Sequence, residues 1–342
     1  MGDINPRPSD DSRADKSDPA NDPDRWLDPS NVPRAAQRIA EAIYRTPLVR
    51  CDRLSKRLGM EVRLKAENLQ VTGSFKDRGA NNAVLSLGDT AACTGVVTHS
   101  SGNHAVALAR AATRRGIPAH IVMPENSLPN KLRGVRDYGI EPILSPPDTP
   151  SRLATAQRVQ AETGAEMVSP FNDTRIIDGQ GTVAMEIFED WPDVEVIVVP
   201  IGGGGLVSGA LSFKRLQPHL RIIGVEPELA DDTYRSLSSG QIEMPTRYDT
   251  MADGLRSALG SITFPTIQRY LDDLWLVGEA RIAEAMRTLV TEARLVAEPS
   301  GAVSLAGLER HAETLQGRNV AIVISGGNLN MDRCGLGRDQ HN

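Results

Sequence analysis

Short β-branched runs alternate with helical patterns from Val32 onward, and this alternation limits what the chain can fold into. Strands are predicted at residues 62–65, 95–99, 119–123, 141–145, 194–200, 221–226 and 319–325. Between them lie segments such as 104–116 and 151–164, in which apolar residues recur at three- and four-residue spacing. Strands separated by helices are typical of a parallel sheet with crossover helices. The sequence therefore predicts an α/β fold.

The length and net charge of the chain limit the kinds of molecule that it is expected to bind. The chain has 342 residues, enough for two domains or one large α/β unit, and a net charge of -6 at pH 7. That charge offers no basic surface for nucleic acid or for an anionic membrane, so we expect small molecules or other protein chains as partners. The three cysteines are far apart, which fits a reduced, cytoplasmic setting.

The chain contains one markedly polar stretch, at its beginning, and one markedly apolar stretch, at 194–211. Residues 1–32 are rich in Asp, Pro and Ser and carry little apolar surface, so we expect a disordered acidic leader. The most apolar stretch, residues 194–211, contains four successive glycines. Glycines in its middle predict a strand, a loop and a helix, and no transmembrane segment.

Three predicted strands run directly into glycine-containing turns. These turns are THSSGNHA at 98–105, PIGGGGLVSG at 200–209 and VISGGNLN at 323–330. Ligands of open α/β sheets bind beyond the carboxyl ends of the strands. We therefore expect the three turns to share one crevice.

The four glycines at 202–205 are the most informative of these turns. Adjacent glycines let backbone N–H groups converge, and a following helix adds its positive N-terminus, which together predict a phosphate site. A tight turn packed on the sheet would need fewer glycines. A rival interpretation takes Gly203, Gly205, Ser208 and Glu226 as a dinucleotide fingerprint of a nicotinamide-dependent oxidoreductase. That fingerprint lacks its third glycine and leaves Lys76 unexplained.

Lys76 lies between a Gly-Ser-Phe turn and an Arg-Gly-Ala segment. A lysine, a phosphate site and a polar turn in one crevice are what pyridoxal phosphate requires. The segments SFKDRGA, SSGNHA, GGGGL, EPSGA and SGGN, in this order, resemble the fold type II pyridoxal-phosphate enzymes, specifically the serine racemase and serine/threonine dehydratase family. The resemblance implies a two-domain fold like that of the tryptophan synthase β subunit. Its large cofactor-binding domain would combine residues 33–94 and 173–336, and its small mobile domain would span 95–172.

The resemblance also implies roles for individual residues. Lys76 would be the Schiff-base lysine, Phe75 would lie beside the cofactor ring, and Asn103 would bond its phenolic oxygen. Ser325 would face the pyridine nitrogen. The phosphate would be held by backbone N–H groups of Gly202, Gly203, Gly204, Gly205 and Leu206. The substrate carboxylate would be bound by Ser100, Ser101, Asn103 and His104, although a backbone hydrogen bond explains His104 equally well.

The reaction implied is dehydration of serine or threonine to a 2-oxo acid and ammonia, with Lys76 as the base for the α-proton. Ser101 matches the racemases of the family, which points to an additional serine racemase activity. Hydroxyaspartate dehydratases of the same group share this serine, so 3-hydroxyaspartate remains an alternative substrate. Arg256 would favour such an acidic substrate, or it forms a surface ion pair. A catalytically silent binding protein is a third class, disfavoured by the retention of both Lys76 and the glycine loop at 202–205.

A second site is predicted near residues 226–232. Two carboxylates, Glu226 and Asp232, supply hard oxygen ligands for Mg²⁺ or Ca²⁺. Alternatively, Asp231 or Asp232 caps the following helix. The resemblance implies that Glu226, the carbonyl of Ala230 and Asp232 bind a structural divalent cation. It also implies a homodimer.

Overall fold

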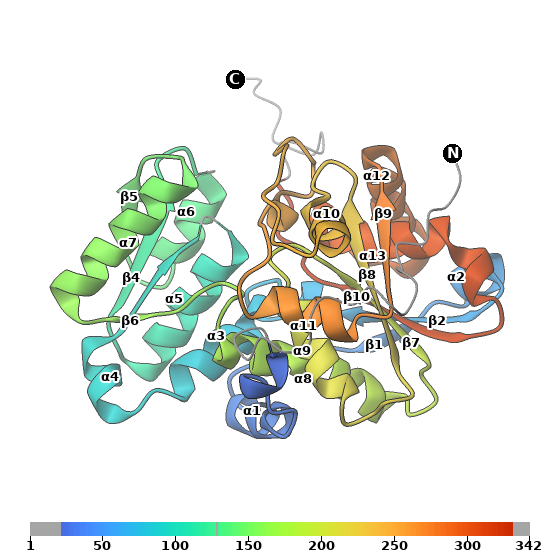
Figure 1. The fold of residues 1–342 in the computed structure, drawn as a ribbon, viewed down its shortest axis with the longest axis horizontal. Coiled ribbons are helices and arrows are strands. Elements are labelled where there is room, and N and C mark those ends of the chain that lie inside the picture. The colour runs from blue at the N-terminus through green and yellow to red at the C-terminus, as the bar shows by residue number, and fades with distance from the viewer. Residues whose placement is uncertain (1–21, 101, 128, 331–342) are drawn as a thin grey trace.

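Two sheets organise the fold of the computed structural model, which describes residues 22–100, 102–127 and 129–330 (Figure 1). The larger sheet has six strands, in the order β1 (Leu48–Arg50), β2 (Glu61–Ala66), β10 (Asn319–Ile324), β7 (Val196–Pro200), β8 (Arg221–Pro227) and β9 (Asp273–Val277). The smaller sheet has four strands, in the order β5 (Ile143–Ser145), β4 (Ala119–Pro124), β3 (Val96–His99) and β6 (Glu166–Met167). Neighbouring strands are parallel except for β1 and β2, which pair antiparallel.

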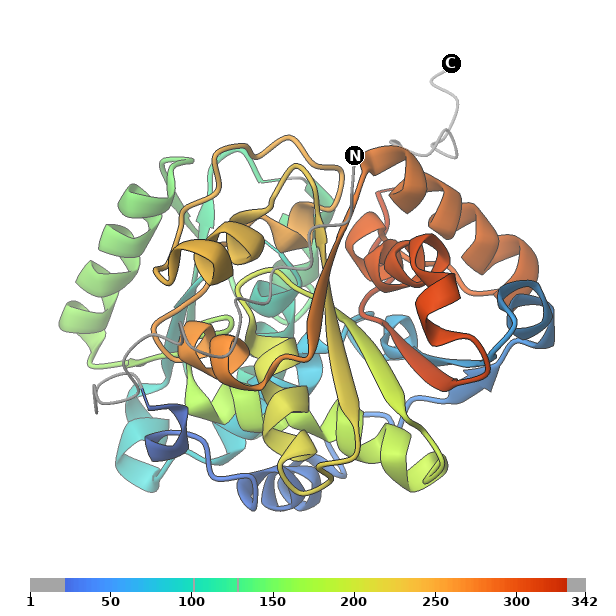
Figure 2. The same ribbon diagram turned by 45° about the vertical axis from the view of Figure 1, so that its right-hand side comes forward.

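Helices flank both sheets (Figure 2). Helix α3 has a special place, because it packs against α5 beside the smaller sheet and against α8 beside the larger one. The α-helices of the described residues are α1 (Asn31–Ile39), α2 (Asp52–Leu58), α3 (Lys76–Leu85), α4 (Asp89–Thr94), α5 (Asn103–Arg115), α6 (Pro129–Arg136), α7 (Thr149–Thr163), α8 (Thr174–Asp190), α9 (Gly205–Lys214), α10 (Asp232–Ser239), α11 (Thr263–Tyr270), α12 (Glu279–Thr288) and α13 (Pro299–Arg310). Short 3₁₀ turns include η3 (Glu67–Leu69) and η4 (Asp253–Leu255).

The core is aliphatic and lies on both faces of the larger sheet. On β10, Val320, Ile322 and Ile324 pack into one cluster, whereas Ala321 and Val323 pack into a second cluster on the opposite face. This alternation follows from the two-residue period of a strand. A parallel strand buried on both faces reads as a continuous apolar run, which is why the strand at 319–325 was visible in the sequence.

Each of the seven predicted strands has a counterpart in the structure, and the α/β prediction is confirmed. The strands β1, β6 and β9 were not predicted. Two of them are only two or three residues long, too short for an alternation pattern to develop.

The prediction of a disordered leader over residues 1–32 is wrong for its last part. Residues 22–32 are folded: Leu27 is 1% exposed, Tyr270 donates its hydroxyl to Asp24 at 2.5 Å, and α1 begins at Asn31. The segment is polar on average, but its few apolar side chains, Leu27 and Val32, are buried and hold it against the rest of the fold. Residues 1–21 lie outside the described part of the chain.

The predicted division into two domains corresponds in part to the two sheets. Strands β3 to β6 all fall within the predicted small domain at 95–172. Helix α3 was assigned to the large domain, but Ala80, Ala83 and Val84 belong to the hydrophobic cluster of the smaller sheet. The boundaries themselves remain a prediction. In the part of the chain that the structure describes, no helix combines the length and apolarity needed to cross a bilayer.

Candidate active site

A cavity of about 760 Å³ lies where three strand ends converge. Ser100 follows β3, Gly202 follows β7 and Ser325 follows β10, and all three line this cavity. Lys76, Phe75, Asn103 and His104 line it as well. The three glycine-containing turns therefore share one crevice, as the sequence predicted.

Lys76 is the first residue of α3 and faces the cavity. Its Nζ donates to the carbonyl of Pro170 at 2.8 Å and lies 4.9 Å from the centre of the Phe75 ring. The side chain is partly exposed because it faces the cavity. Desolvation by the surrounding protein nevertheless lowers the pKa of Lys76 to about 8. A substantial neutral fraction near physiological pH gives this amine the character of a nucleophile and a base.

The loop at 202–205 accepts only glycine. A Cβ at Gly202 would meet the Cα of Leu255 at 2.9 Å, one at Gly205 would meet the Cα of Phe171 at 2.9 Å, and one at Gly203 would enter the Phe171 ring. Gly204 has a φ of +86°, a conformation that favours glycine. Helix α9 starts at Gly205, so its N-terminus and the loop N–H groups present positive partial charge to an anion.

Asn103 opens α5 and is held from two sides. Its Nδ2 donates to Glu298 Oε1 at 2.6 Å, and its Oδ1 accepts from Asn328 Nδ2 at 3.0 Å. One N–H of the Asn103 amide is left for a ligand.

Glu298 was not predicted as a site residue, although it begins EPSGA, one of the segments that carry the resemblance to the family. Burial, and then the nearby Asp253, raise the pKa of Glu298 to about 7. Asp253 in turn accepts from Lys131 Nζ at 2.6 Å. An acidic residue directly before Pro299 and a run of small residues was the available signal, but its partner Asn103 is 195 positions away.

The remaining predicted residues of the cavity have simpler surroundings. Ser325 is 4% exposed, and its hydroxyl contacts the carbonyl of Ser300 at 3.4 Å. His104 Nε2 lies 3.4 Å from the carbonyl of Val168, and burial, followed by Lys76, lowers the pKa of His104 to about 3. His104 is therefore neutral. Its ring contacts the backbone, which agrees with the second of the two interpretations given for it from the sequence. Ser101 lies outside the described residues.

The predicted cation ligands lie apart from the cavity. Glu226 accepts from the backbone N–H groups of Thr233 at 2.8 Å and Tyr234 at 3.0 Å, so it, and not Asp232, caps the first turn of α10. Both carboxylate oxygens of Asp232 are buried without a hydrogen-bond partner among the described residues. Burial, and then Asp232, raise the pKa of Glu226 well above its usual value. No cluster of three or more acidic, His or Cys ligands occurs among residues 22–100, 102–127 and 129–330.

Comparison with known proteins places this site in a family. Residues 39–326 match the family described as "Pyridoxal-phosphate dependent enzyme". The chain is 42% identical over 300 residues to a beta-hydroxyaspartate dehydratase of Paracoccus denitrificans, covering 87% of this chain and 95% of that protein. It is 43% identical over 307 residues to a serine racemase of Arabidopsis thaliana, covering 88% and 93%.

A solved structure gives the same result. The structure of maize serine racemase superimposes with a TM-score of 0.88 at 39% identity, covering 91% of this chain and 96% of that chain. The family match over residues 39–326 includes every strand from β1 to β10. The chain therefore belongs to the family of pyridoxal-phosphate dependent enzymes.

Proposed function

We propose that this protein is a pyridoxal-phosphate-dependent serine/threonine ammonia-lyase that also racemises serine. The observation that carries the proposal is a single cavity lined by Lys76, the glycine loop at 202–205, Asn103 and Ser325. Relatives named serine racemase and L-threonine ammonia-lyase support the substrate class.

The residues of the cavity fit the cofactor. The amine of Lys76, which faces the cavity, would hold the aldehyde carbon, and the N–H groups of residues 202–206 would hold the phosphate. Ser325 would face the ring nitrogen, and the spare N–H of Asn103 would reach the phenolic oxygen. When bound, the cofactor supplies an electron sink for the carbanion formed at the substrate α-carbon.

The protein's own residues would bind the substrate and move its proton. The N-terminus of α5, with Ser100, Gly102 and Asn103, is oriented to receive a carboxylate. Lys76 Nζ, with its lowered pKa, would take the α-proton. His104 stays neutral beside Lys76, so it adds no positive charge that would lower the basicity of that amine.

3-Hydroxyaspartate is the alternative substrate. Arg152 and Arg256 both line the cavity, and an arginine pairs well with a second substrate carboxylate. Arg256 donates from Nε to the carbonyl of Thr250 at 3.1 Å. A relative named beta-hydroxyaspartate dehydratase, at 42% identity, supports this candidate. The nicotinamide-dependent oxidoreductase is excluded by the family, and Glu226, its expected ribose ligand, caps α10 instead.

We also propose a structural Mg²⁺ or Ca²⁺ held by Glu226, the carbonyl of Ala230 and Asp232. Glu226 and Asp232 are each 1% exposed, and neither carboxylate oxygen of Asp232 has a hydrogen-bond partner among the described residues. A hard divalent cation would neutralise both carboxylates and use oxygen ligands of the kind it prefers. The homodimer and the cytoplasmic setting remain predictions.

The test of the main proposal is the absorbance spectrum and activity of the purified protein. Wild type should carry the visible band of lysine-bound cofactor and release pyruvate from L-serine. Lys76→Ala should lose both, because no other residue supplies the amine and the base together. Lys56→Ala, which removes an exposed lysine of α2, is the matched control. Turnover near the wild-type rate in Lys76→Ala would remove the central role of this lysine.

A further inference from the structure

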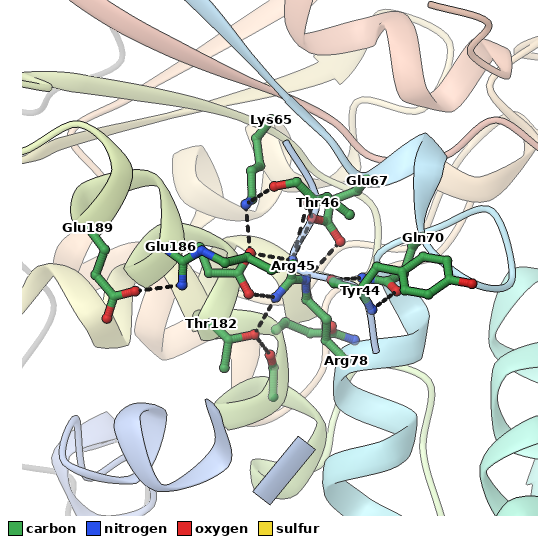
Figure 3. Close-up of polar contacts among 12 residues, drawn as sticks. Tyr44, Arg45, Thr46, Lys65, Glu67, Gln70, Arg78, Thr182, Glu186 and Glu189 are labelled. Carbon is green, nitrogen blue, oxygen red and sulfur yellow. Dashed lines mark hydrogen bonds and ion pairs between the residues drawn. The ribbon is translucent and has the colours of Figure 1, made fainter. Parts of the chain in front are cut away.

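Four charged side chains form a buried cluster around Arg78, whose contacts Figure 3 shows. Lys65 on β2, Glu67 on η3 and Arg78 on α3 are each 0% exposed, and Glu186 on α8 is 8% exposed. Charged residues are rarely buried to this extent unless they are paired. The cluster joins α8 to three elements that follow one another in the sequence, namely β2, η3 and α3.

Arg78 is the centre of this cluster. Its guanidinium donates from Nε and Nη2 to the two oxygens of Glu67, both at 2.8 Å. It donates from Nη1 and Nη2 to the two oxygens of Glu186, at 2.7 and 2.8 Å. Nη1 also reaches the hydroxyl of Thr182 at 3.0 Å. Bidentate pairs on both sides fix the guanidinium in position and in orientation.

The cluster is balanced in charge. Lys65 donates to Glu186 at 2.6 Å and to the carbonyl of Thr46 at 2.7 Å, so two cations face two carboxylates. A buried pair of this kind adds little net stability compared with apolar side chains, whereas removal of one partner leaves an uncompensated charge. We therefore expect the cluster to matter more for the placement of the elements it joins than for the stability of the fold.

The geometry that the cluster fixes is the first turn of α3. Arg78 is two residues after Lys76 in the same helix. Between them, Asp77 accepts from the backbone N–H and the hydroxyl of Thr72, at 2.6 and 2.7 Å. At Gly79 the helix touches α8, because a Cβ there would lie 2.8 Å from the carbonyl oxygen of Ile176. Lys76 is thus attached to a turn that is held from several directions.

We propose that the Arg78 cluster is the positioning element of Lys76, which holds the start of α3 so that Nζ points into the cavity. This inference rests on the proposed function, in which Lys76 binds the cofactor. Arg78, Glu67, Glu186 and Lys65 act through the backbone of α3 and touch neither cofactor nor substrate. Reactions that depend on placement lose about 10²-fold in rate when a group is displaced by about 1 Å.

The experiment measures how fast the full-length protein, stripped of cofactor, captures added pyridoxal phosphate, followed by the visible band. Arg78→Lys keeps the charge but loses the two-sided fork, and it should slow capture by about 10²-fold. In the reconstituted enzyme, kcat for L-serine should fall while KM changes little, because α5 and not α3 holds the substrate carboxylate.

The matched control is Arg45→Gln. Arg45 pairs with Glu189 and Asp190 on the same helix as Glu186, but this pair is exposed at the surface. Arg45→Gln should capture cofactor at the wild-type rate. Equal slowing in Arg45→Gln and Arg78→Lys would overturn the proposal, because the effect would then not belong to the buried cluster.

A second variant covers the case in which Arg78→Lys does not fold. Lys65→Met combined with Glu186→Gln removes one charge of each sign, keeps the cluster balanced, and leaves Arg78 held mainly by Glu67. Capture should slow by roughly tenfold. A lower melting temperature with capture at the wild-type rate, in either variant, would mean a purely structural cluster and overturn the proposal. A wild-type protein that forms no band would instead overturn the proposed function.

Discussion

Asn103 and Glu298 connect the two sheets across the cavity. Asn103 opens α5 beside the smaller sheet, Glu298 precedes α13 beside the larger one, and their side chains meet at 2.6 Å. Lys131 on α6 and Asp253 on η4 form a second connection at 2.6 Å. Both connections use an acidic residue that lines the cavity.

Glu298 should make stability depend on pH. Its pKa in the folded protein is raised to about 7, so it binds a proton more tightly when folded, and its stabilising contribution is lost as pH rises from about 4.5 through 7. Glu298→Gln should remove this loss. Relative to wild type, the variant should gain about 2 to 3 kcal/mol in unfolding free energy between pH 5 and pH 8. Denaturant unfolding of the cofactor-free proteins at pH 5 and pH 8 measures this difference in unfolding free energy. The prediction would be contradicted if the unfolding free energy of wild type and variant changed equally between the two pH values.

Ser101 should separate racemisation from dehydration. Inversion at the α-carbon needs a proton-transfer group on each face, and Lys76 supplies one of them in the proposed function. Ser101→Ala should lower conversion of L-serine to D-serine by about 10² to 10⁴ while dehydration of L-serine largely persists. Chiral chromatography alongside pyruvate release measures both reactions.

Ser127→Ala is the control for Ser101→Ala, because the hydroxyl of Ser127 lines the same cavity but is bonded to the carbonyl of Pro124 at 2.6 Å. It should leave both reactions unchanged. If Ser101→Ala lowered the turnover of L- and D-serine equally, Ser101 would be a carboxylate-binding residue and the racemase assignment would be withdrawn.

Arg256 should distinguish the two candidate substrates. If it binds a second carboxylate, Arg256→Gln should lower kcat/KM for 3-hydroxyaspartate by about 10-fold or more and leave that for L-serine nearly unchanged. Arg247→Gln is the control, since Arg247 pairs with Asp249 at 2.5 Å in the same loop and does not line the cavity. An equal effect of Arg256→Gln on both substrates would assign Arg256 to the structure of the loop.

Removal of a divalent cation should destabilise the protein. If Glu226, Ala230 and Asp232 hold Mg²⁺ or Ca²⁺, excess EDTA should lower the melting temperature, and added cation should restore it. At a free cation concentration of about 100 times Kd, the bound ion contributes about 2.7 kcal/mol. Asp232→Asn should abolish the response, whereas Asp231→Asn, whose carboxylate pairs with Arg235 at 2.9 Å, should keep it. A melting curve indifferent to EDTA and cation would rule the site out.

The sequence predicted what depends on local pattern. Lys76 and the glycine loop, which line one cavity, were predicted to do so because their neighbours form short, ordered motifs. Strands β7 and β10 were predicted because they are continuous apolar runs. Glu298 was not identified, because its role depends on Asn103, which is 195 residues away. The same holds for Lys65, whose charge inside a predicted strand has meaning only with Glu186, 121 residues away. Residues 22–32 were misjudged because composition averages over the few apolar side chains that anchor them.

The glycine loop also sets a limit on how the sequence can drift. Alanine at residues 202, 203, 204 or 205 would meet a different obstacle in each case: the Leu255 backbone, the Phe171 ring, the Thr263 side chain or the Phe171 backbone. No single compensating change relieves all four, and two of the obstacles are backbone, which no substitution can shorten. A side chain at any of these four positions would therefore force a neighbouring group to shift, so we expect this loop to tolerate far less sequence change than the exposed surface.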